Sequence, residues 1–424
     1  MNCVVKAIFA FLSRERDEKA EVGCHIFLFN KFACHSFEYH IVIAGYSNSL
    51  GTFRLIISKA SDQDVILLPW SNPGVNPYNY ISHAAMLELD TNYIEIPIAY
   101  HIVKNTNNTD TYDDGTIIDY NKSIQYQQKV LKIQYGTTGE SMKPDDDPDF
   151  TPGGQEIKIR FVILTKDGLK YPDDNDNYNE STNNYYSFTE TTDTNWLNGN
   201  DIYLNNTGSG LLSDSLQASG DCVLTYNGQE VCNVYCSNEG SYLGYATYPD
   251  QNAGETAHGV WIRTKTMPFS ESDTRPNYTP SKWIYAGGGT LSHEIGHWLG
   301  LDHTFSNNGC QLQRGLERSL DTPIHSSSNF GSFIQSQGVR YAKDDPYFVQ
   351  NNLDSCPNDT GYDPVYNIMN YAEDDSLTWF TDDQYAIMLG SIWQFMGPLW
   401  PNYENLASNP KLLKINSWKY DTDI

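Results

Sequence analysis

The feature that most constrains this chain is an H-E-x-x-H-x-x-G-x-x-H pattern at residues 293–303. On a helix, His293 and His297 lie one turn apart on the same face, which is the spacing at which two imidazoles bind one zinc ion. Glu294 lies one position further round, within reach of a metal-bound water. Gly300 can adopt the left-handed conformation that ends a helix, so His303 can return as a third ligand. Three ligands leave one position open, which indicates a catalytic rather than a structural zinc site.

The length of the pattern argues against a chance match on a solvated helix face. A bare HExxH occurs by chance in on the order of one chain in a hundred. The glycine and the third histidine at fixed offsets lower that rate by roughly another thousandfold. Three of the ten histidines of the chain also fall within these eleven residues. We therefore expect the pattern to be a metal site.

The charge of the chain excludes two classes of partner. The 27 basic and 53 acidic side chains give a net charge of −26. Such a chain repels nucleic acid and anionic membrane surfaces, so we expect neither as a partner. No run of apolar residues approaches the eighteen or more that a membrane span needs, so we expect no transmembrane helix.

Residues 1–90 differ in pattern from the rest. They contain Cys3, Cys24 and Cys34, and short apolar runs without a helical period. We interpret this segment as a signal or propeptide region that is removed on activation of a zymogen. An accessory domain, or a wrongly assigned start, remains an equal alternative.

The segments that follow predict a mixed sheet backed by a helix. Residues 94–103 alternate as a strand, residues 123–134 are rich in helix formers, and residues 157–164 form a second strand pattern, which is a β-α-β order. We expect residues 172–210, rich in Asp, Asn, Ser, Thr and Tyr, to be a long surface insert. Further elements are predicted before the zinc pattern: a hairpin with an Asn-Gly turn at 223–231 and strands at 242–249 and 259–263.

The chain after His303 is expected to be rich in loops as far as residue 364. A tight hydrophobic turn with Met369 and Tyr371 follows. Thr381 and Gln384 then form a capping-box pattern, which predicts the start of a final helix.

Taken together, these stretches resemble the pappalysin branch of the metzincin zinc proteases. The resemblance covers roughly residues 93–396. It is carried by five segments: Leu243–Pro249, Gly288–Leu301, His303–Phe305 with Cys310 and Asp321–Pro323, Asn367–Tyr371, and Phe380-Thr381 with Gln384.

The resemblance implies an α+β fold with a two-lobed, metzincin-like catalytic domain over residues 91–400. The upper lobe, 91–300, would hold a twisted mixed sheet with a backing helix and the active-site helix. The lower lobe, 301–400, would be irregular and loop-rich, with a C-terminal helix. Residues 401–424 would be a tail.

The resemblance also implies a zinc-dependent endopeptidase that is secreted, monomeric and active on protein or peptide substrates. His293, His297 and His303 would be the zinc ligands, and Glu294 the general base that activates the zinc-bound water. Met369 would form a hydrophobic floor beneath the metal. Tyr371 has two open interpretations, a transition-state stabiliser or a packed aromatic ring.

The cysteines test the extracellular assignment. The resemblance implies a disulfide between Cys310 and Cys356, whereas two free thiols are expected in a reducing cytoplasm. The family's second lower-lobe cysteine pair is absent, since its position before Phe380 is Ser376. The pairing of the remaining central cysteines stays open: Cys222, Cys232 and Cys236.

Calcium is a second cofactor that the resemblance suggests. The family's Gly-Asp before Asp-Thr-Pro is replaced here by Leu316 and Glu317, although Glu317 and Asp321 still offer oxygen ligands. The acidic run 373–375 has three open interpretations: a preference for basic substrates, a solvated loop or a calcium site.

Two alternative functions are less well supported. Glu317, twenty residues after His297, would be the third ligand in another class of zinc peptidase, but His303 makes this less favourable. A secreted binding or adhesion protein with a vestigial protease fold is the other alternative. Degenerate copies of an enzyme lose a ligand or the glutamate, and here all four residues are intact.

Overall fold

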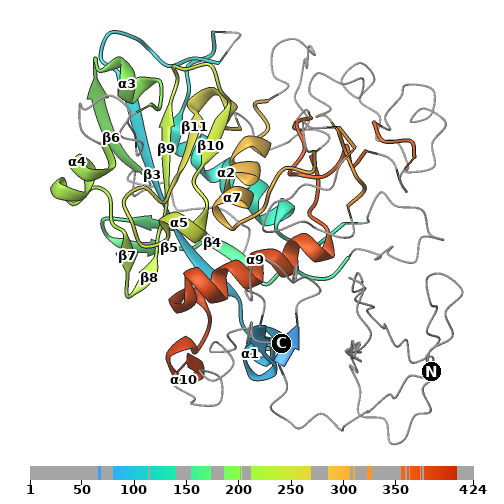
Figure 1. Ribbon diagram of the computed structural model, residues 1–424. Helices are drawn as coiled ribbons and strands as arrows, with labels where there is room; N and C mark the ends of the chain where they lie inside the picture. Colours follow the sequence, from blue (N-terminus) through green and yellow to red (C-terminus); the bar gives the residue numbers. More distant parts are fainter. Residues whose placement is uncertain are drawn as a thin grey trace, which may run out of the picture. The chain divides into compact units, whose positions relative to one another are not determined.

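A seven-stranded mixed sheet organises the part of the chain that the computed structural model describes (Figure 1). This part lies in a compact unit, Asp62–Ile424, while Met1–Ser61 and the cysteines at 3, 24 and 34 fall outside the described residues. The described residues are 65–67, 80–112, 115–139, 154–172, 186–200, 202, 212–268, 285–305, 309–310, 322–326, 355–358, 361, 363–372, 374 and 377–407.

The sheet is parallel at its centre and antiparallel at both ends. Six of its strands follow the order β10 (Gly244–Ala246), β11 (Val260–Arg263), β9 (Cys232–Ser237), β3 (Ile94–Asn105), β4 (Ile159–Thr165) and β5 (Gly168–Lys170), and the seventh, β6 (Tyr186–Thr191), pairs with β3 outside this order. β3 pairs in parallel with β4 and β9, and β9 with β11, whereas β10 and β5 are antiparallel to their neighbours. The predicted mixed sheet is therefore confirmed.

Strand β9 lies at the centre of the sheet, although its sequence does not predict a strand. All six of its residues are buried, including Asn233 and Ser237. Cys232, Val234 and Cys236 face one core, and Tyr235 faces another, as the two-residue period of a strand requires. Both faces of β9 are covered, so the hydrophobic alternation of a half-exposed strand is missing.

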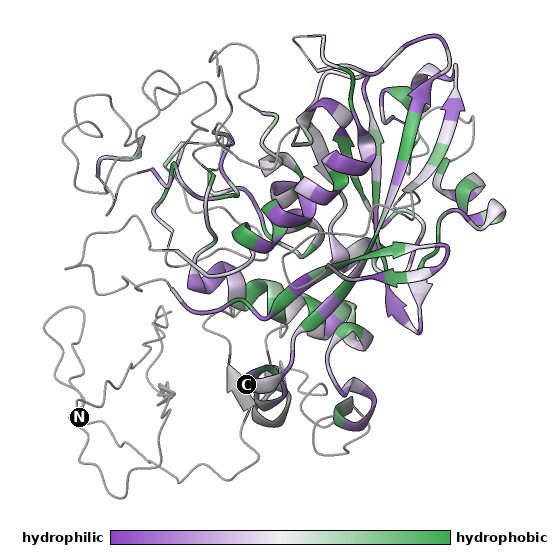
Figure 2. Cartoon of the chain, turned by 180° about the vertical axis from the view of Figure 1, so that it is seen from behind, coloured by the Kyte–Doolittle hydropathy of each residue, from purple (hydrophilic) through white to green (hydrophobic). Residues whose placement is uncertain are grey.

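The two faces of the sheet are covered by different helices. α2 (Tyr120–Gln134) and α7 (Gly289–Trp298) share one core with the sheet, to which Ile124, Leu131, Leu291 and Ile295 contribute. α3 (Thr194–Leu197) and α4 (Leu212–Ser219) cover the other face with Leu197, Leu212 and Leu216. Figure 2, seen from behind, shows hydrophobic green along the strands and purple on the outer helix surfaces.

Two sequence-based expectations meet different outcomes in the middle of the chain. The expected surface insert 172–210 is wrong in part, because it contains β6 (Tyr186–Thr191), which pairs in parallel with the second half of β3. The predicted hairpin is confirmed as β7 (Thr225–Tyr226) and β8 (Gln229–Glu230). Its turn residues Asn227 and Gly228 both have positive φ, 52° and 81°, as a two-residue hairpin turn requires.

The final helix forms as predicted, and the segment after it contacts α1 near the start of the described chain. α9 (Asp382–Phe395) begins with the capping box of Thr381 and Gln384. After it, the indole N–H of Trp400 donates to the backbone oxygen of Ala85 in α1 (His83–Thr91), at 3.1 Å. The short helix α10 (Tyr403–Ala407) follows, so ordered structure extends into the expected tail. No helix in the described part of the chain is long and apolar enough to cross a membrane.

These contacts sharpen the domain boundaries, which remain a prediction. Ala85 and Leu89 of α1 are buried in the main core. We expect a chain that begins at residue 62 to fold, and one that begins at residue 92 to lose about 3 kcal/mol of unfolding free energy, from the exposed Leu89 site and the lost indole hydrogen bond. Urea unfolding of both chains measures this difference. Trp400→Phe in the longer chain is the matched control for the hydrogen bond alone, and equal stability of the two chains would contradict the expectation.

Candidate metal centre

The H-E-x-x-H residues lie on α7, and a buried carboxylate caps the start of this helix. All ten residues of α7 are buried. The backbone N–H groups of Gly287 and Gly289 donate to Oδ2 of Asp374, at 2.7 and 3.2 Å. A negative charge is favourable at a helix N-terminus. Asp374 is therefore part of the helix support rather than a solvated loop residue, and the other two members of the acidic run lie outside the described residues.

The end of α7 turns as the sequence predicts. Gly300 has φ +96°, in the left-handed region. The N–H of Gly300 donates to the backbone oxygen of His297 at 2.8 Å, and the N–H of Leu301 donates to the backbone oxygen of Gly296 at 2.9 Å. These two bonds form a Schellman motif, which satisfies carbonyl groups at the helix end and reverses the chain. The reversal brings His303 back to the helix.

The three predicted histidines converge on one point. One ligand nitrogen each of His293, His297 and His303 lies within 4.8 Å of the other two. Nε2 of His297 lies 3.0 Å from Nε2 of His303. The ring centroid of His293 lies 4.8 Å from the ring centroid of His297 and 5.2 Å from that of His303. The arrangement is a cluster of three imidazoles that can bind one ion.

Two of the imidazoles are held in the tautomer that a metal requires. Nδ1 of His293 donates to the backbone oxygen of Ile368 at 2.7 Å, and Nδ1 of His297 donates to that of Leu301 at 2.6 Å. A carbonyl oxygen carries no proton, so each Nδ1 must carry one, and each Nε2 presents a lone pair. Nε2 of His293 is buried without a hydrogen-bond partner among the described residues. These lone pairs fit a cation.

Burial keeps the three histidines neutral. It lowers the pKa of His293 to about 3, helped by the neighbouring His297. Burial also lowers the pKa of His297 to about 4. The pKa of His303 is lowered by burial and by both neighbouring imidazoles. Neutral imidazole is the form that ligates a metal ion, so the centre is ready for one at neutral pH.

The side chain of Glu294 packs against the edge strand β10. A Cβ on Gly244 of β10 would lie 2.8 Å from Oε1 of Glu294, so only a glycine leaves room for this carboxylate. Burial raises the pKa of Glu294 well above its ordinary value. A carboxylate with a raised pKa accepts and releases protons more readily near neutral pH, which suits an acid–base role.

Met369 packs directly beneath α7, where the sequence places a hydrophobic floor. Met369 is fully buried. Its Sδ would lie 2.4 Å from a Cβ on Gly296, between the two histidines of the helix. The glycine inside the H-E-x-x-H pattern is therefore required by close packing.

We expect Gly296→Ala to lower the unfolding free energy by about 1–3 kcal/mol, because the new methyl group overlaps a buried sulfur. The better helix propensity of alanine offsets up to about 1 kcal/mol of this cost. Urea unfolding of Gly296→Ala, Met369→Ala and the double variant measures the coupling. The double variant should cost less than the two single changes together, and additive costs would show that the two sites do not contact each other.

Tyr371 lies beside the cluster on the side of His303. Its ring centroid is 4.7 Å from that of His303 and 5.4 Å from that of His293, and 40% of the residue is exposed. Burial raises the pKa of Tyr371 to about 12, and the charge of Glu294 adds to the shift. The phenol therefore keeps its proton at neutral pH and can donate a hydrogen bond.

Two supports of the site were missed from the sequence. Tyr248, after β10, donates to Oδ1 of Asp302 at 2.9 Å, and its hydroxyl lies 3.3 Å from Nδ1 of His297. The side-chain amides of Asn367 and Gln384 exchange two hydrogen bonds of 2.7 and 3.0 Å, and Asn367 also accepts from the N–H of Met369. The capping residue of α9 thus fixes the turn that carries Met369.

The disulfide between Cys310 and Cys356 is present, which confirms that prediction. Cys222, Cys232 and Cys236 are buried free thiols. Glu317 and Asp321, the suggested calcium ligands, and Ser376 lie outside the described residues. Within the described residues, the three histidines form the one cluster suited to a metal ion.

His293, Glu294 and His297 on a helix that ends at a glycine, with His303 just after it, form a centre that can bind one metal ion. The family described as "Pregnancy-associated plasma protein-A", Peptidase_M43, matches residues 244–392, which include the whole centre. The resemblance to the pappalysin family of metalloproteases seen in the sequence is therefore confirmed for residues 244–392.

Several fungal proteins are similar to this chain. An extracellular metalloprotease of Aspergillus fumigatus is 31% identical over 151 residues, which are 34% of this chain and 38% of that protein. One of Arthroderma benhamiae is 28% identical over 282 residues, 62% of this chain and 79% of that protein. The chain thus spans well under two thirds of the first of these relatives. Mature mirolysin of Tannerella forsythia, solved with a cleaved peptide, is 20% identical with a TM-score of 0.44, over 76% of this chain and 100% of that chain.

Proposed function

We propose that this chain is a zinc-dependent endopeptidase that acts outside the cell as a monomer. The observation that carries the proposal is the convergence of the imidazoles of His293, His297 and His303, with Glu294 next to His293 on α7. An all-nitrogen set of three ligands suits zinc better than calcium, which prefers oxygen. The disulfide of Cys310 and Cys356 and the extracellular relatives support secretion.

The residues of the chain divide the chemistry of peptide hydrolysis among them. When bound, zinc supplies a Lewis acid that makes water more acidic and polarises a carbonyl group. Glu294 accepts the proton of the attacking water and passes it to the nitrogen of the leaving amine. Tyr371 keeps its own proton and donates a hydrogen bond to the carbonyl oxygen as negative charge develops there. Met369 and Gly296 hold the base of the site in place.

A digest of a denatured protein mixture tests the proposal. We expect the full chain, before or after limited proteolysis of its N-terminal region, to cleave internal peptide bonds. The zinc chelator 1,10-phenanthroline should abolish the cleavage, and added zinc should restore it. Sequencing the fragments would give the cleavage-site preference. If the zinc-loaded protein cleaves nothing, the alternative of a binding protein with a vestigial protease fold is favoured.

A further inference from the structure

A buried polar network lies in the lower lobe, away from the metal. We call Ser355, Asp363 and His325 the lower-lobe network. Oδ1 of Asp363 accepts hydrogen bonds from the N–H of Ser355 at 2.9 Å and from its hydroxyl at 2.8 Å. Nε2 of His325 lies 3.3 Å from Oδ2 of Asp363, and both residues are buried. Neither residue has a part in the proposed peptide hydrolysis.

One end of the network contacts the segment that carries the third ligand. Nδ1 of His325 lies 3.4 Å from the hydroxyl of Thr304, the residue after His303. The backbones of Phe305 and His325 form a β-bridge, and their rings meet edge to face at 5.9 Å. The ring of Phe305 in turn stacks on the imidazole of His303, at 4.6 Å and an interplanar angle of 9°. His325 thus supports His303 through the two residues that follow it, Thr304 and Phe305.

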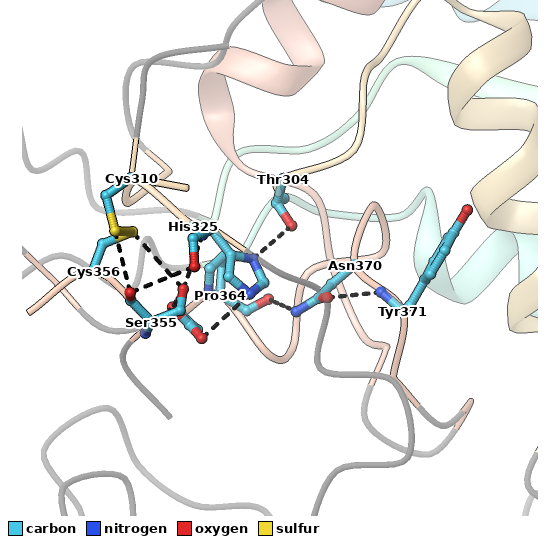
Figure 3. Close-up of polar contacts among 10 residues, drawn as sticks. Thr304, Cys310, His325, Ser355, Cys356, Pro364, Asn370 and Tyr371 are labelled. Atoms are coloured by element: carbon cyan, nitrogen blue, oxygen red, sulfur yellow. Dashed lines mark hydrogen bonds and ion pairs between the residues drawn. A yellow bond between two sulfur atoms is a disulfide. The ribbon is translucent and has the colours of Figure 1, made fainter. Parts of the chain in front are cut away.

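The other end of the network contacts the disulfide. Ser355 precedes Cys356, and the sulfur of Cys310 lies 3.2 Å from the backbone oxygen of Ser355. The hydroxyl of Ser355 also accepts from the N–H of Ser326, beside His325, at 2.9 Å. The disulfide therefore fixes the residue that holds Asp363. Figure 3 shows the disulfide, Ser355, His325 and Thr304 in sequence along this line.

A side branch of the network reaches Tyr371. The backbone oxygen of Pro364, next to Asp363, accepts from the side-chain amide of Asn370 at 3.2 Å. The N–H of Tyr371 donates to Oδ1 of Asn370 at 2.7 Å (Figure 3). The segment around Asp363 is thus connected through His325 to Thr304, beside His303, and through Asn370 to Tyr371.

The electrostatics of Asp363 show how strongly the network is held. Burial opposes its charge, yet the contacts with His325 and Ser355 outweigh burial and lower the pKa of Asp363 below its ordinary value. A buried carboxylate held by two hydrogen bonds from Ser355 and by the nearby imidazole of His325 has little freedom to move, and removal of one partner leaves it uncompensated. Such a group can fix the relative position of the segments that it joins.

We propose that His325 and Asp363 are positioning residues for the metal centre, and that they transmit the constraint of the Cys310–Cys356 disulfide to the ring of His303. The proposal rests on the proposed function, in which His303 is a ligand. His303 follows a chain reversal at Gly300 and precedes residues 306–308, which lie outside the described residues. Besides the other two imidazoles, the described rings that contact His303 are those of Tyr371 and of Phe305, which His325 contacts in turn. Loss of the network should therefore weaken metal binding before it abolishes folding.

Zinc affinity of the full chain, measured by competition with a fluorescent chelator at pH 7.5, tests the proposal. We expect His325→Leu to weaken zinc binding by about tenfold, at the low end of the effect of residues that orient metal ligands. His325→Gln, whose amide can contact both Thr304 and Asp363, should retain most of the affinity. The visible spectrum of the cobalt-loaded protein should change in His325→Leu and not in His325→Gln, because it reports the geometry of the ligands.

Replacement of the disulfide tests the second half of the proposal. Cys310→Ser with Cys356→Ser should also weaken zinc binding by about tenfold. Added to His325→Leu, it should weaken binding little further, because residues in one chain of contacts are not additive. Independent effects that multiply to about a hundredfold would overturn the coupling between the disulfide and His303.

His101→Leu is the matched control. His101 is also a buried, hydrogen-bonded histidine, but it contacts Ser187 and Asn233 in the upper lobe. It should lower stability without changing zinc affinity. If His325→Leu behaves like His101→Leu, the network is merely structural and the proposal is wrong. Thr304→Val is the milder variant to measure if His325→Leu does not fold, and unchanged affinity and cobalt spectrum there would count against the proposal. A wild-type chain that binds no zinc would instead overturn the proposed function.

Discussion

Glu294→Gln should bind zinc as tightly as the wild type and lose at least about a thousandfold in kcat/KM, within the range that general acid–base groups contribute. The amide of glutamine matches the carboxylate in size but cannot accept a proton from water. Glu294 is buried and its pKa is raised, so its charge is unfavourable in the folded state without a metal. The neutral amide should therefore leave the stability of the metal-free protein unchanged or higher.

Two measurements separate the base from the metal site in this experiment. Zinc content by elemental analysis should equal that of the wild type in Glu294→Gln. His303→Ala is the comparison variant, because it removes one of the three ligands and should lose both zinc and activity. Turnover close to the wild type in zinc-loaded Glu294→Gln would exclude Glu294 as the general base.

The metal centre was predictable because its geometry is almost entirely local. Helical periodicity places His293 and His297 on one face, and a left-handed glycine is one of the few ways to end a helix and return the chain. Gly300 does take that conformation, at φ +96°. Eleven consecutive residues thus contain most of the information that brings the three imidazoles together.

The supports of the centre were not predictable, because they depend on contacts across long stretches of sequence. Asp374 caps α7 from 85 residues away, and nothing in its acidic neighbourhood distinguishes it from a solvated loop. Asn367 pairs with Gln384, whose pattern predicts only a helix start. Tyr248 meets His297 across 49 residues. Each of these contacts depends on how distant segments of the chain pack together. No local pattern in a single sequence indicates such packing.

Strands were predicted where their sequence is rich in apolar residues, and missed where buried positions are polar. β3 was visible from isoleucines at every second position from Ile94 to Ile98. β9 consists of Cys, Asn, Val, Tyr, Cys and Ser, and its polar residues are buried with partners. Asn233, for example, bonds His101 and two backbone carbonyl groups. Tertiary hydrogen bonds make a central strand out of residues with low strand preference.

The same buried histidines predict a strong acid sensitivity of the metal-free protein. The pKa of His293 falls to about 3, and those of His297 and His101 fall to about 4, in each case mainly by burial. The pKa of His303 is lowered as well. In the unfolded chain all four titrate near pH 6.5, so below that pH the unfolded state binds protons that the folded state does not. Stability is present above pH 6.5 and is lost as the pH falls.

Glu294 acts in the opposite direction and does not cancel the effect. Its pKa is raised in the folded state, so the folded protein holds a proton that the unfolded carboxylate has already lost. Its contribution to stability therefore increases as the pH falls toward the unfolded value. Four histidines against one glutamate leave a net uptake of about three protons on unfolding. At about 1.4 kcal/mol per proton and pH unit, the slope is on the order of 4 kcal/mol per unit below pH 6.

At about 4 kcal/mol per unit, the 5–15 kcal/mol stability of a typical domain is lost within about one to four pH units. The metal-free protein should therefore be several kcal/mol less stable at pH 5.5 than at pH 7.5 and should unfold at about pH 5 or below. Zinc binds only the folded state and stabilises it by mass action, so the loaded protein should stay folded at pH 5.5. Because the folded histidines are already neutral, protons compete with the metal in the folded state only near pH 4 and below. Urea unfolding of metal-free and zinc-loaded protein at pH 7.5, 6.5 and 5.5 measures both effects. Equal stability of the metal-free protein at pH 7.5 and 5.5 would show that the imidazoles are not held neutral by burial, and that the centre opens to water when the metal leaves.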